Sequence, residues 1–258
     1  MQSAFIVHSP STKYYAELLA PKWRNPELYE VTKGPDESIV NLRHGKDVTI
    51  AIGGGSVIDT AKIFSGNKLC YAVPTTASGA AMTSHAAVWG ERKTSVRTVK
   101  PILKRNYYGM TKRLSDDVKT ATMYDCLSHA YESLWSKNAT DRSKRHATKA
   151  IKLVELYNER HDMNDLIDAG NEAGKAIEIT GTNVIHALSY PLTLGGMPHG
   201  EACGMVMNKI ARYMIGELIV NRQWNDKIEE HIIDKALEYP QIHTANKPIT
   251  KEILEKIL

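Results

Sequence analysis

The pattern of hydrophobic and polar residues changes once along the chain, and its first third alternates between two periods. Short apolar, β-prone runs occur at SAFIVHS, ELYEV, DVTIAIG and KLCYAVP. Between them, residues 14–19, 37–42 and 56–65 carry apolar side chains at helical spacing. Strands that alternate with helices are typical of βαβ units, which form parallel sheets. The pattern therefore predicts an α/β domain in this part of the chain.

After about Asp116 the strand pattern disappears and only helical spacing remains. It covers the segments 116–137, 141–160 and 163–190, and continues from about residue 201 to the end. A basic segment with a proline and a glycine, residues 100–115, interrupts both patterns. We therefore predict two domains, a compact α/β domain over residues 1–112 and an all-helical domain over residues 113–258.

The sequence VTIAIGGGSVIDTAK, residues 48–62, joins a predicted buried strand directly to a predicted helix. Three glycines, Gly53, Gly54 and Gly55, stand at the junction and are followed by Ser56. Backbone N–H groups at a helix start are unpaired and favour an anion, and glycine allows a phosphate to approach the backbone. The alternative is a tight turn without a ligand. We favour the anion site, although the sequence is not the G-x-G-x-x-G fingerprint.

A second polar loop, VPTTASG at residues 73–79, follows the next predicted strand. Its hydroxyl groups belong to Thr75, Thr76 and Ser78. In open α/β sheets, ligands bind at the carboxyl ends of the strands. An ordinary polar loop is the alternative for this segment alone. Two such loops at the same edge of a sheet favour a nucleotide cofactor.

Candidate metal ligands occur in the helical half. In YDCLSHAYES, Asp125 and His129 are four residues apart and so share one helix face. Further on, His186 lies in an apolar helical segment and His199 follows a Gly-Gly-Met-Pro turn. Three imidazoles and one carboxylate suit Fe(II) or Zn(II). Spacing alone leaves the alternatives open, which are a surface Asp–His pair and satisfied core histidines.

Composition narrows the class of protein further. The chain has 258 residues, of which 42% are hydrophobic and 24% charged, with a net charge of +4. No apolar run reaches the ~18–20 residues of a membrane span, and the dispersed lysines and arginines form no nucleic-acid-binding stripe. Cys70, Cys126 and Cys203 are far apart, which fits a reducing cytoplasm better than a disulfide framework. We therefore expect a cytoplasmic protein with a small-molecule partner and no nucleic-acid or membrane partner, and leave a homodimer open.

Taken in order, the segments AIGGGSVIDTAK, VPTTASG, YDCLSHAYES and HALSYPLTLGGMPHGEAC resemble the iron-dependent (group III) alcohol dehydrogenases. This family belongs to the dehydroquinate synthase-like superfamily. The resemblance is strong over roughly residues 48–212 and weak at the ends. It implies an N-terminal dinucleotide-binding α/β domain with a parallel sheet and an all-α C-terminal metal-binding domain, with the metal in the cleft between them.

The resemblance also implies roles for individual residues. The ligands of Fe(II), or of Zn(II) in its place, would be Asp125, His129, His186 and His199. NAD or NADP would be bound by Gly53, Gly54, Gly55, Ser56, Asp59, Thr75, Thr76, Ser78 and Lys93. Tyr190 stands where the family often has a further histidine, and is a candidate for the proton route. No acidic residue follows Val31, where Thr32 and Lys33 stand, and this absence permits NADP.

The implied activity is transfer of hydride between a nicotinamide and a small alcohol or aldehyde, with the metal as Lewis acid. The segments AGKAIEITGTNVIHALSYPLT and SKNATDRSKRHATKAI look closest to the branch with phosphonoacetaldehyde reductases, which make 2-hydroxyethylphosphonate. Lys137, Arg142 and Arg145 are candidate phosphonate-binding residues, and a solvated basic helix is the alternative. Two other functions stay open, a dehydroquinate synthase-like lyase and a shortened, non-catalytic relative that binds metal or nucleotide.

Overall fold

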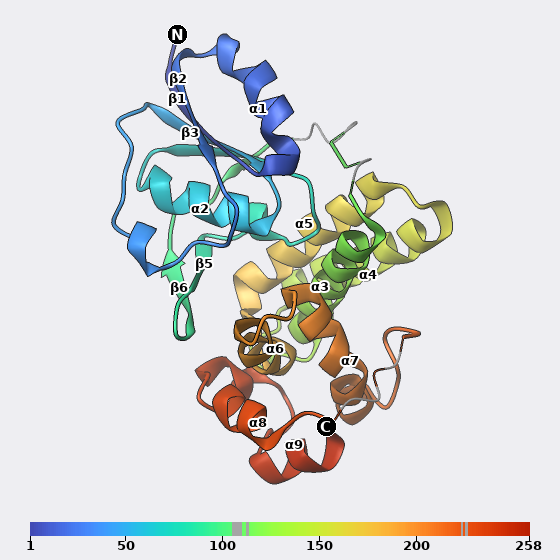
Figure 1. Ribbon diagram of the computed structural model, residues 1–258. Helices are drawn as coiled ribbons and strands as arrows, with labels where there is room; N and C mark the ends of the chain where they lie inside the picture. The colour runs from blue at the N-terminus through green and yellow to red at the C-terminus, as the bar shows by residue number, and fades with distance from the viewer. Residues whose placement is uncertain (105–109, 112–113, 223, 225–226) are drawn as a thin grey trace.

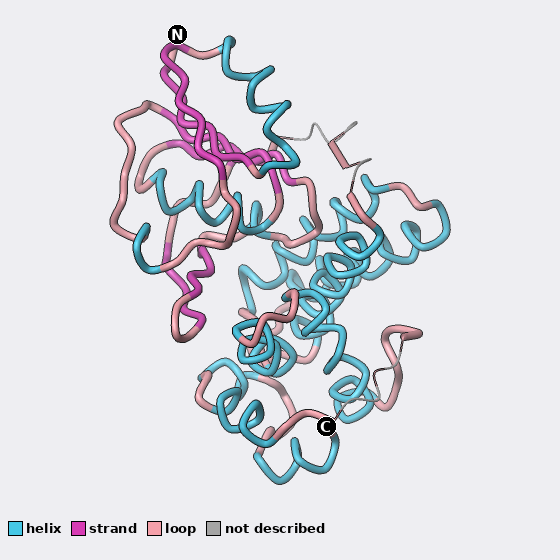
Figure 2. Tube along the Cα trace, viewed as in Figure 1, coloured by secondary structure: helices cyan, strands magenta, loops and turns pink. Residues whose placement is uncertain are grey.

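The computed structural model describes residues 1–104, 110–111, 114–222, 224 and 227–258. A region of strands and helices forms the N-terminal part of the chain, and helices form the rest (Figure 1; Figure 2). The predicted domain boundary, between residues 112 and 113, lies outside the described residues. Among the described helices, none is long and apolar enough to cross a membrane.

The N-terminal part is built on a parallel five-stranded sheet with the strand order β2-β1-β3-β4-β7. The strands are β1 (Ser3–His8), β2 (Arg24–Glu30), β3 (Val48–Gly53), β4 (Leu69–Pro74) and β7 (Ile102–Leu103). Alternate side chains of β1 pack on opposite faces: Phe5 and Val7 lie with α2 (Gly55–Ser65), and Ala4 and Ile6 lie with α1 (Lys13–Leu19). Burial on both faces explains the nearly continuous apolar strands. The predicted α/β fold and its first four strands are confirmed.

Two features of this part differ from the prediction. The helix expected at residues 37–42 is only a single 3₁₀ turn, Glu37–Ile39. An antiparallel hairpin of β5 (His85–Trp89) and β6 (Lys93–Arg97), which the hydropathy pattern did not indicate, follows β4. Its strands mix polar and apolar residues, so that their pairing, rather than their local composition, defines the element.

Seven helices form the described C-terminal part: α3 (Asp116–Leu134), α4 (Asp141–Arg160), α5 (Met163–Thr180), α6 (Val184–Leu194), α7 (His199–Ile215), α8 (Glu230–Leu237) and α9 (Lys251–Ile257). The pattern at residues 163–190 is divided into α5 and α6, because Gly181 ends α5 with a positive φ of 68°. Further short 3₁₀ turns are Pro10–Thr12, Ala20–Lys22, Ala80–Met82 and Pro240–Thr244.

Two glycines of α5 determine how the two parts meet. A Cβ atom at Gly170 would lie 2.3 Å from the carbonyl oxygen of Ala77, and one at Gly174 would lie 2.4 Å from that of Gly79. Only glycine permits such close approach of backbone to backbone. The loop after β4 therefore packs directly on α5, and the carboxyl edge of the sheet faces the helices.

Candidate metal and nucleotide site

A cleft of about 650 Å³ lies between the sheet edge and the helices. Gly55, Ser56, Thr76 and Ser78, from the two loops at the strand ends, line one wall, and the hairpin adds Trp89 and Lys93. The helices line the opposite wall with residues that include Asp125, His129, His186, Tyr190 and His199. The structure therefore brings most of the predicted cofactor and metal residues to one cavity.

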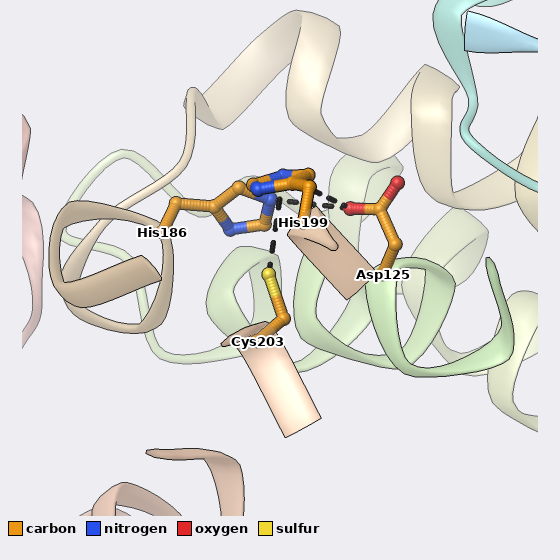
Figure 3. A group of neighbouring side chains, drawn as sticks. All are labelled: Asp125, His186, His199 and Cys203. Atoms are coloured by element: carbon orange, nitrogen blue, oxygen red, sulfur yellow. Dashed lines mark hydrogen bonds and ion pairs between the residues drawn. The ribbon is translucent and has the colours of Figure 1, made fainter. Parts of the chain in front are cut away.

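Three of the four predicted metal ligands, the histidines, surround one carboxylate oxygen of the fourth, Asp125. Oδ1 of Asp125 lies 3.6 Å from Nε2 of His129, and Nε2 of His186 is 3.5 Å away from it. The Nε2 atom of His199 lies 3.6 Å from the same oxygen. Atoms bound tetrahedrally to an ion at about 2.1 Å would be about 3.4 Å apart, so that these separations suit a single divalent ion. Figure 3 shows the carboxylate of Asp125 with the imidazoles of His186 and His199.

Unpaired buried atoms support the same interpretation. Oδ1 of Asp125 and Nε2 of His186 are buried without a hydrogen-bond partner. A buried polar atom without a partner normally costs about 1–3 kcal/mol, and most such atoms in folded proteins are paired. Both atoms face the other donors of the cluster. The donor set therefore fits a metal ion of the Fe(II) or Zn(II) type.

The helices place these side chains through their spacing and through a glycine. Asp125 and His129 lie one turn apart on α3, and His199 is the first residue of α7. The next residue is Gly200, where a Cβ atom would lie only 1.9 Å from the carbonyl oxygen of Ala121 in α3. The glycine lets the start of α7 contact α3, and this contact brings His199 next to Asp125.

Glu132 is a site residue that the sequence analysis missed. Its carboxylate is completely buried and accepts a hydrogen bond from Nδ1 of His186 at 2.7 Å. It also accepts hydrogen bonds from three backbone N–H groups, those of Asn183 at 2.9 Å, Ile185, and His186 at 3.1 Å. A carboxylate that holds one ring nitrogen directs the other at the metal position. The available signal was an acidic residue three positions after His129 on a buried helix face.

The cluster's electrostatics give the charge states that metal binding requires. Burial opposes ionisation of Asp125, but the three imidazoles outweigh it and hold the pKa of this carboxyl well below its usual range. Burial lowers the pKa of His129 to about 3 and that of His199 to about 4, although Asp125 opposes both shifts. The carboxylate is thus charged and these imidazoles are neutral at pH 7, as metal ligands must be.

His186 differs from the other two histidines. Burial lowers its pKa, but the negative charge of Glu132 outweighs burial and raises the pKa well above the usual value. A metal ion bound through Nε2 of His186 would require the neutral form of this ring.

The two predicted cofactor loops lie side by side. A Cβ atom at Gly54 would lie 3.1 Å from Oγ1 of Thr76, and one at Gly55 would lie 3.1 Å from Oγ of Ser78. Gly53, the last residue of β3, instead contacts the following helix α2, where a Cβ atom at Gly53 would lie 2.6 Å from Val57. Gly53, Gly54 and Thr75 do not line the cleft, whereas the other residues of the two loops named for the cofactor do.

Asp59, a further predicted cofactor residue, holds the walls of the cleft together. Its carboxylate accepts Nζ of the fully buried Lys62 at 2.9 Å and the backbone N–H of Ala87 at 3.0 Å. Nζ of Lys62 also donates to the carbonyl oxygen of His85 at 2.6 Å. The pair therefore ties α2 to strand β5 of the hairpin. Asp59 lines the cleft as well, so that a contact with a ligand is compatible with this role.

Lys93 and Tyr190 contact each other across the cleft. Nζ of Lys93 lies 3.3 Å from the hydroxyl of Tyr190, which is 3.4 Å from Oγ1 of Thr182. The Tyr190 ring is stacked on His199 with a centroid distance of 6.0 Å. Trp89, which the sequence analysis did not single out, packs edge-on against His199 at 5.7 Å. An aromatic wall and one lysine therefore flank the metal cluster.

The three predicted phosphonate-binding residues do not line this cleft. Nζ of Lys137 donates to the carbonyl oxygen of His243 at 2.9 Å. Arg142 is exposed on α4, and Arg145 lines a separate surface groove along the same helix. The exposed positions of Arg142 and Arg145 agree with the alternative of a solvated basic helix.

The chain thus combines a parallel sheet, a helical part and a metal-type cluster in the cleft between them. Residues 119–256 match the family model for the C-terminal part of the Fe-containing alcohol dehydrogenase family. The chain therefore belongs to this family. An iron-containing alcohol dehydrogenase from Thermotoga maritima has the same fold, with a TM-score of 0.82 at 22% identity, over 99% of this chain and 90% of that one.

Two curated relatives share more of the sequence. A phosphonoacetaldehyde reductase from Streptomyces viridochromogenes is 31% identical over an alignment 209 positions long, which covers 65% of this chain and 53% of the relative. A 4-hydroxybutyrate dehydrogenase from Clostridium kluyveri is 30% identical over an alignment 223 positions long, which covers 68% of this chain and 58% of the relative. The matched region thus spans little more than half the length of these relatives.

Proposed function

We propose that this chain is a metal-dependent, NAD(P)-linked alcohol dehydrogenase or aldehyde reductase, which transfers hydride between a nicotinamide and a small alcohol or aldehyde. The observation that carries the proposal is the convergence of three imidazoles on Oδ1 of Asp125, at 3.5 and 3.6 Å. This cluster opens into a cleft whose opposite wall contains the glycine turn and the hydroxyl loop. Family membership supports the same activity.

The residues around the cluster would each contribute to the chemistry. A bound Fe(II) or Zn(II) ion would supply Lewis acidity towards the substrate oxygen, and its ligands would be Asp125, His129, His186 and His199. Glu132 would hold His186 in the ligating orientation through the 2.7 Å hydrogen bond. Trp89 and Tyr190 would exclude water from one side. The hydroxyl groups of Tyr190 and Thr182, 3.4 Å apart, would provide a proton route beside Lys93.

For the substrate we propose a small aldehyde with an anionic group, with phosphonoacetaldehyde as the first compound to test. The names of the two relatives refer to phosphonoacetaldehyde and to 4-hydroxybutyrate, and both compounds carry an anion. Among the described residues that line the cleft, Lys93 is the only lysine or arginine. Lys93 would therefore contact either the substrate anion or the ribose of the nicotinamide, the role that the family resemblance implies.

The choice between NAD and NADP depends on the end of β2. Lys33, just beyond this strand, forms an ion pair with Asp36 at 2.8 Å and is largely exposed. No acidic residue stands at positions 31–33, where a carboxylate would bind a ribose diol and repel a 2′-phosphate. We propose that the site accepts NADP. The rates of oxidation of NADH and NADPH will show which cofactor is preferred.

The test is a coupled assay of metal content and cofactor oxidation. The full chain is loaded with Fe(II) or Zn(II) and mixed with NADH or NADPH and one of three aldehydes: phosphonoacetaldehyde, succinic semialdehyde or propanal. We expect metal-dependent net oxidation of the cofactor. Full metal occupancy without turnover on any aldehyde would instead support a non-catalytic relative. Turnover of a carbohydrate-type phosphate without net cofactor oxidation would support a lyase.

A further inference from the structure

Cys203 lies four residues after His199 on α7 and points into the same cluster. Its side chain is completely buried, and its Sγ atom is 3.9 Å from Nε2 of His199. The donor atoms of Asp125, His186, His199 and Cys203 all lie within 4.8 Å of one another. Figure 3 shows the sulfur of Cys203 directed at the imidazole of His199, and a dashed line marks this contact. The sulfur therefore belongs to the cluster by position.

We propose that Cys203 is an additional ligand of the ion in this pocket, and that its thiolate gives the site a preference for softer ions such as Zn(II) and Co(II). The inference rests on the metal centre of the proposed function. It goes beyond the carboxylate and three imidazoles, which offer only oxygen and nitrogen. Soft thiolate ligands favour Zn(II), whereas Mn(II) prefers oxygen ligands.

The packing of α7 explains how the sulfur reaches the cluster. Gly200 and Gly204 flank Cys203, and a Cβ atom at Gly204 would lie 2.5 Å from Cδ2 of Tyr124. A Cβ atom at Gly200 would lie closer still, 1.9 Å from the carbonyl oxygen of Ala121. Both contacts are with α3, the helix that carries Asp125. The two glycines, three residues before Cys203 and one residue after it, therefore let this segment of α7 pack closely on α3.

Polar atoms of the cluster lie beside Cys203, although residues of the helical hydrophobic core surround it as well. The ring of His199 contacts the sulfur at 3.9 Å. The nearby hydroxyl groups of Ser128 and Ser189 donate to backbone carbonyl oxygens, at 2.7 and 2.9 Å. Two unpaired buried atoms, Oδ1 of Asp125 and Nε2 of His186, face the same space.

The coordination step is balanced without any redox partner. The thiol of Cys203 releases its proton to solvent, and a sulfur lone pair forms the bond to the ion. No electron is transferred, and the oxidation state of the ion does not change. The expected complex then contains one sulfur ligand beside nitrogen and oxygen ligands.

Cobalt provides the first test, because its spectrum separates binding from sulfur ligation. The metal-free full chain is titrated with Co(II). Ligand-field bands in the visible report that cobalt is bound, and a thiolate-to-cobalt charge-transfer band in the near ultraviolet reports the sulfur ligand. We expect both in the wild type and only the ligand-field bands in Cys203→Ser. The matched control is Cys70→Ser, which removes a buried thiol from β4 and should retain both.

Metal competition gives a second readout. Cys203→Ser should lower the preference for Zn(II) over Mn(II) on the order of tenfold. X-ray absorption of the wild-type zinc complex needs no variant, and should contain a sulfur scatterer at about 2.3 Å. Bound cobalt without a charge-transfer band, or a zinc shell without sulfur, would overturn the inference and leave the metal centre intact. Failure to bind cobalt, zinc or manganese would overturn both.

Discussion

Among the described residues of the helical part, a buried carboxylate meets basic side chains around Glu172 and around Asp125, and the two clusters differ in how completely their atoms are paired. Glu172 of α5 binds Nδ1 of His146 at 2.6 Å, Nζ of Lys175 at 2.8 Å and Nζ of Lys149 at 3.2 Å. Asp125 has imidazole nitrogens at 3.5 and 3.6 Å, and its Oδ1 has no hydrogen bond. Short contacts complete the first cluster, whereas the second leaves room for an ion.

The difference shows which buried carboxylate has a place for a further ligand. A saturated carboxylate in a network of short hydrogen bonds stabilises the folded state, because each charge is compensated there. A buried carboxylate oxygen without a hydrogen-bond partner can instead take a ligand that completes the group. Removal of the charge should therefore abolish metal binding at the Asp125 cluster, whereas its removal from the Glu172 cluster should leave metal binding unchanged.

The largest expected effect is that of Asp125→Asn. Loss of the charged ligand should abolish high-affinity metal binding and lower aldehyde reduction by about a thousandfold or more. The free energy of unfolding of the metal-free protein should also fall at pH 7, because the imidazoles that hold the pKa of this carboxyl well below its usual range lose their charged partner. Metal analysis, cofactor oxidation and urea unfolding measure the three quantities. Retention of high-affinity metal binding would contradict the role of Asp125 as a ligand.

Glu132→Gln should have the next largest effect and should affect both properties. Its carboxylate orients His186 and also accepts backbone N–H groups at the start of α6. Loss of a carboxylate behind a ligating histidine typically lowers metal affinity by about 10–100-fold. The buried donors left without a charged acceptor should lower the free energy of unfolding by about 2–3 kcal/mol. Zinc competition and urea unfolding measure the two effects, and an unchanged zinc affinity would contradict the positioning role.

Lys93→Met should change substrate preference rather than fold. If Lys93 contacts the substrate anion, kcat/KM should fall about tenfold for phosphonoacetaldehyde and change little for propanal, because a charge-assisted hydrogen bond contributes about 1.5–3 kcal/mol. An equal loss for both aldehydes, with a raised KM for the cofactor, would assign the lysine to the nicotinamide ribose instead. Far-ultraviolet circular dichroism serves as the check on folding.

Glu172→Gln should lower stability and leave metal affinity unchanged. Burial raises the pKa of Glu172, but hydrogen bonds from Lys175, His146 and Lys149 outweigh it and lower the pKa from 4.5 to about 2. A lowered carboxyl pKa adds stability above the unfolded-state value, and this contribution is lost as the pH falls towards the folded value. Urea unfolding should therefore give a difference of about 1–2 kcal/mol at pH 7 that narrows from about pH 5 to about pH 2.

The matched control for this variant is Glu159→Gln. Glu159 lies on the exposed side of α4, where substitutions usually change stability by less than about 0.5 kcal/mol. A difference for Glu172→Gln that is constant over the whole pH range would contradict the electrostatic origin of its contribution.

The sequence predicted what depends on local pattern. Apolar runs located β1 to β4, and helical spacing located the helices that carry Asp125, His129 and His186. The spacing could not indicate that Glu132 meets the segment at Asn183, because the two are 51 residues apart and only the packing of α3 on α6 joins them. The hairpin that presents Trp89 was missed for a similar reason, since strand pairing defines it.

Cys203 is a second residue whose contacts could not be predicted from local sequence pattern. Its distance along the chain from the other cysteines indicated only that it forms no disulfide framework. The sequence did not indicate a role for Gly200 and Gly204, which the contacts with Ala121 and Tyr124 explain. Whether the four predicted ligands bind a metal stays a prediction, although the structure brings them to one point.

The smallest expected effect is that of Arg145→Met, and it tests the phosphonate hypothesis of the sequence against the geometry of the cleft. Arg145 lines a groove on α4 together with Lys144 and Lys149, and none of these residues lines the cleft. Because the side chain is exposed and distant charges are screened by salt, kcat/KM for phosphonoacetaldehyde should change less than about twofold at physiological ionic strength. A tenfold loss, with propanal unaffected, would mean that the substrate reaches α4 and that the cluster around Asp125 is not where the anion binds. The same measurement on Lys93→Met then decides which of the two basic residues binds the substrate anion. Only one of them can lie near an anion whose aldehyde group is at the metal cluster.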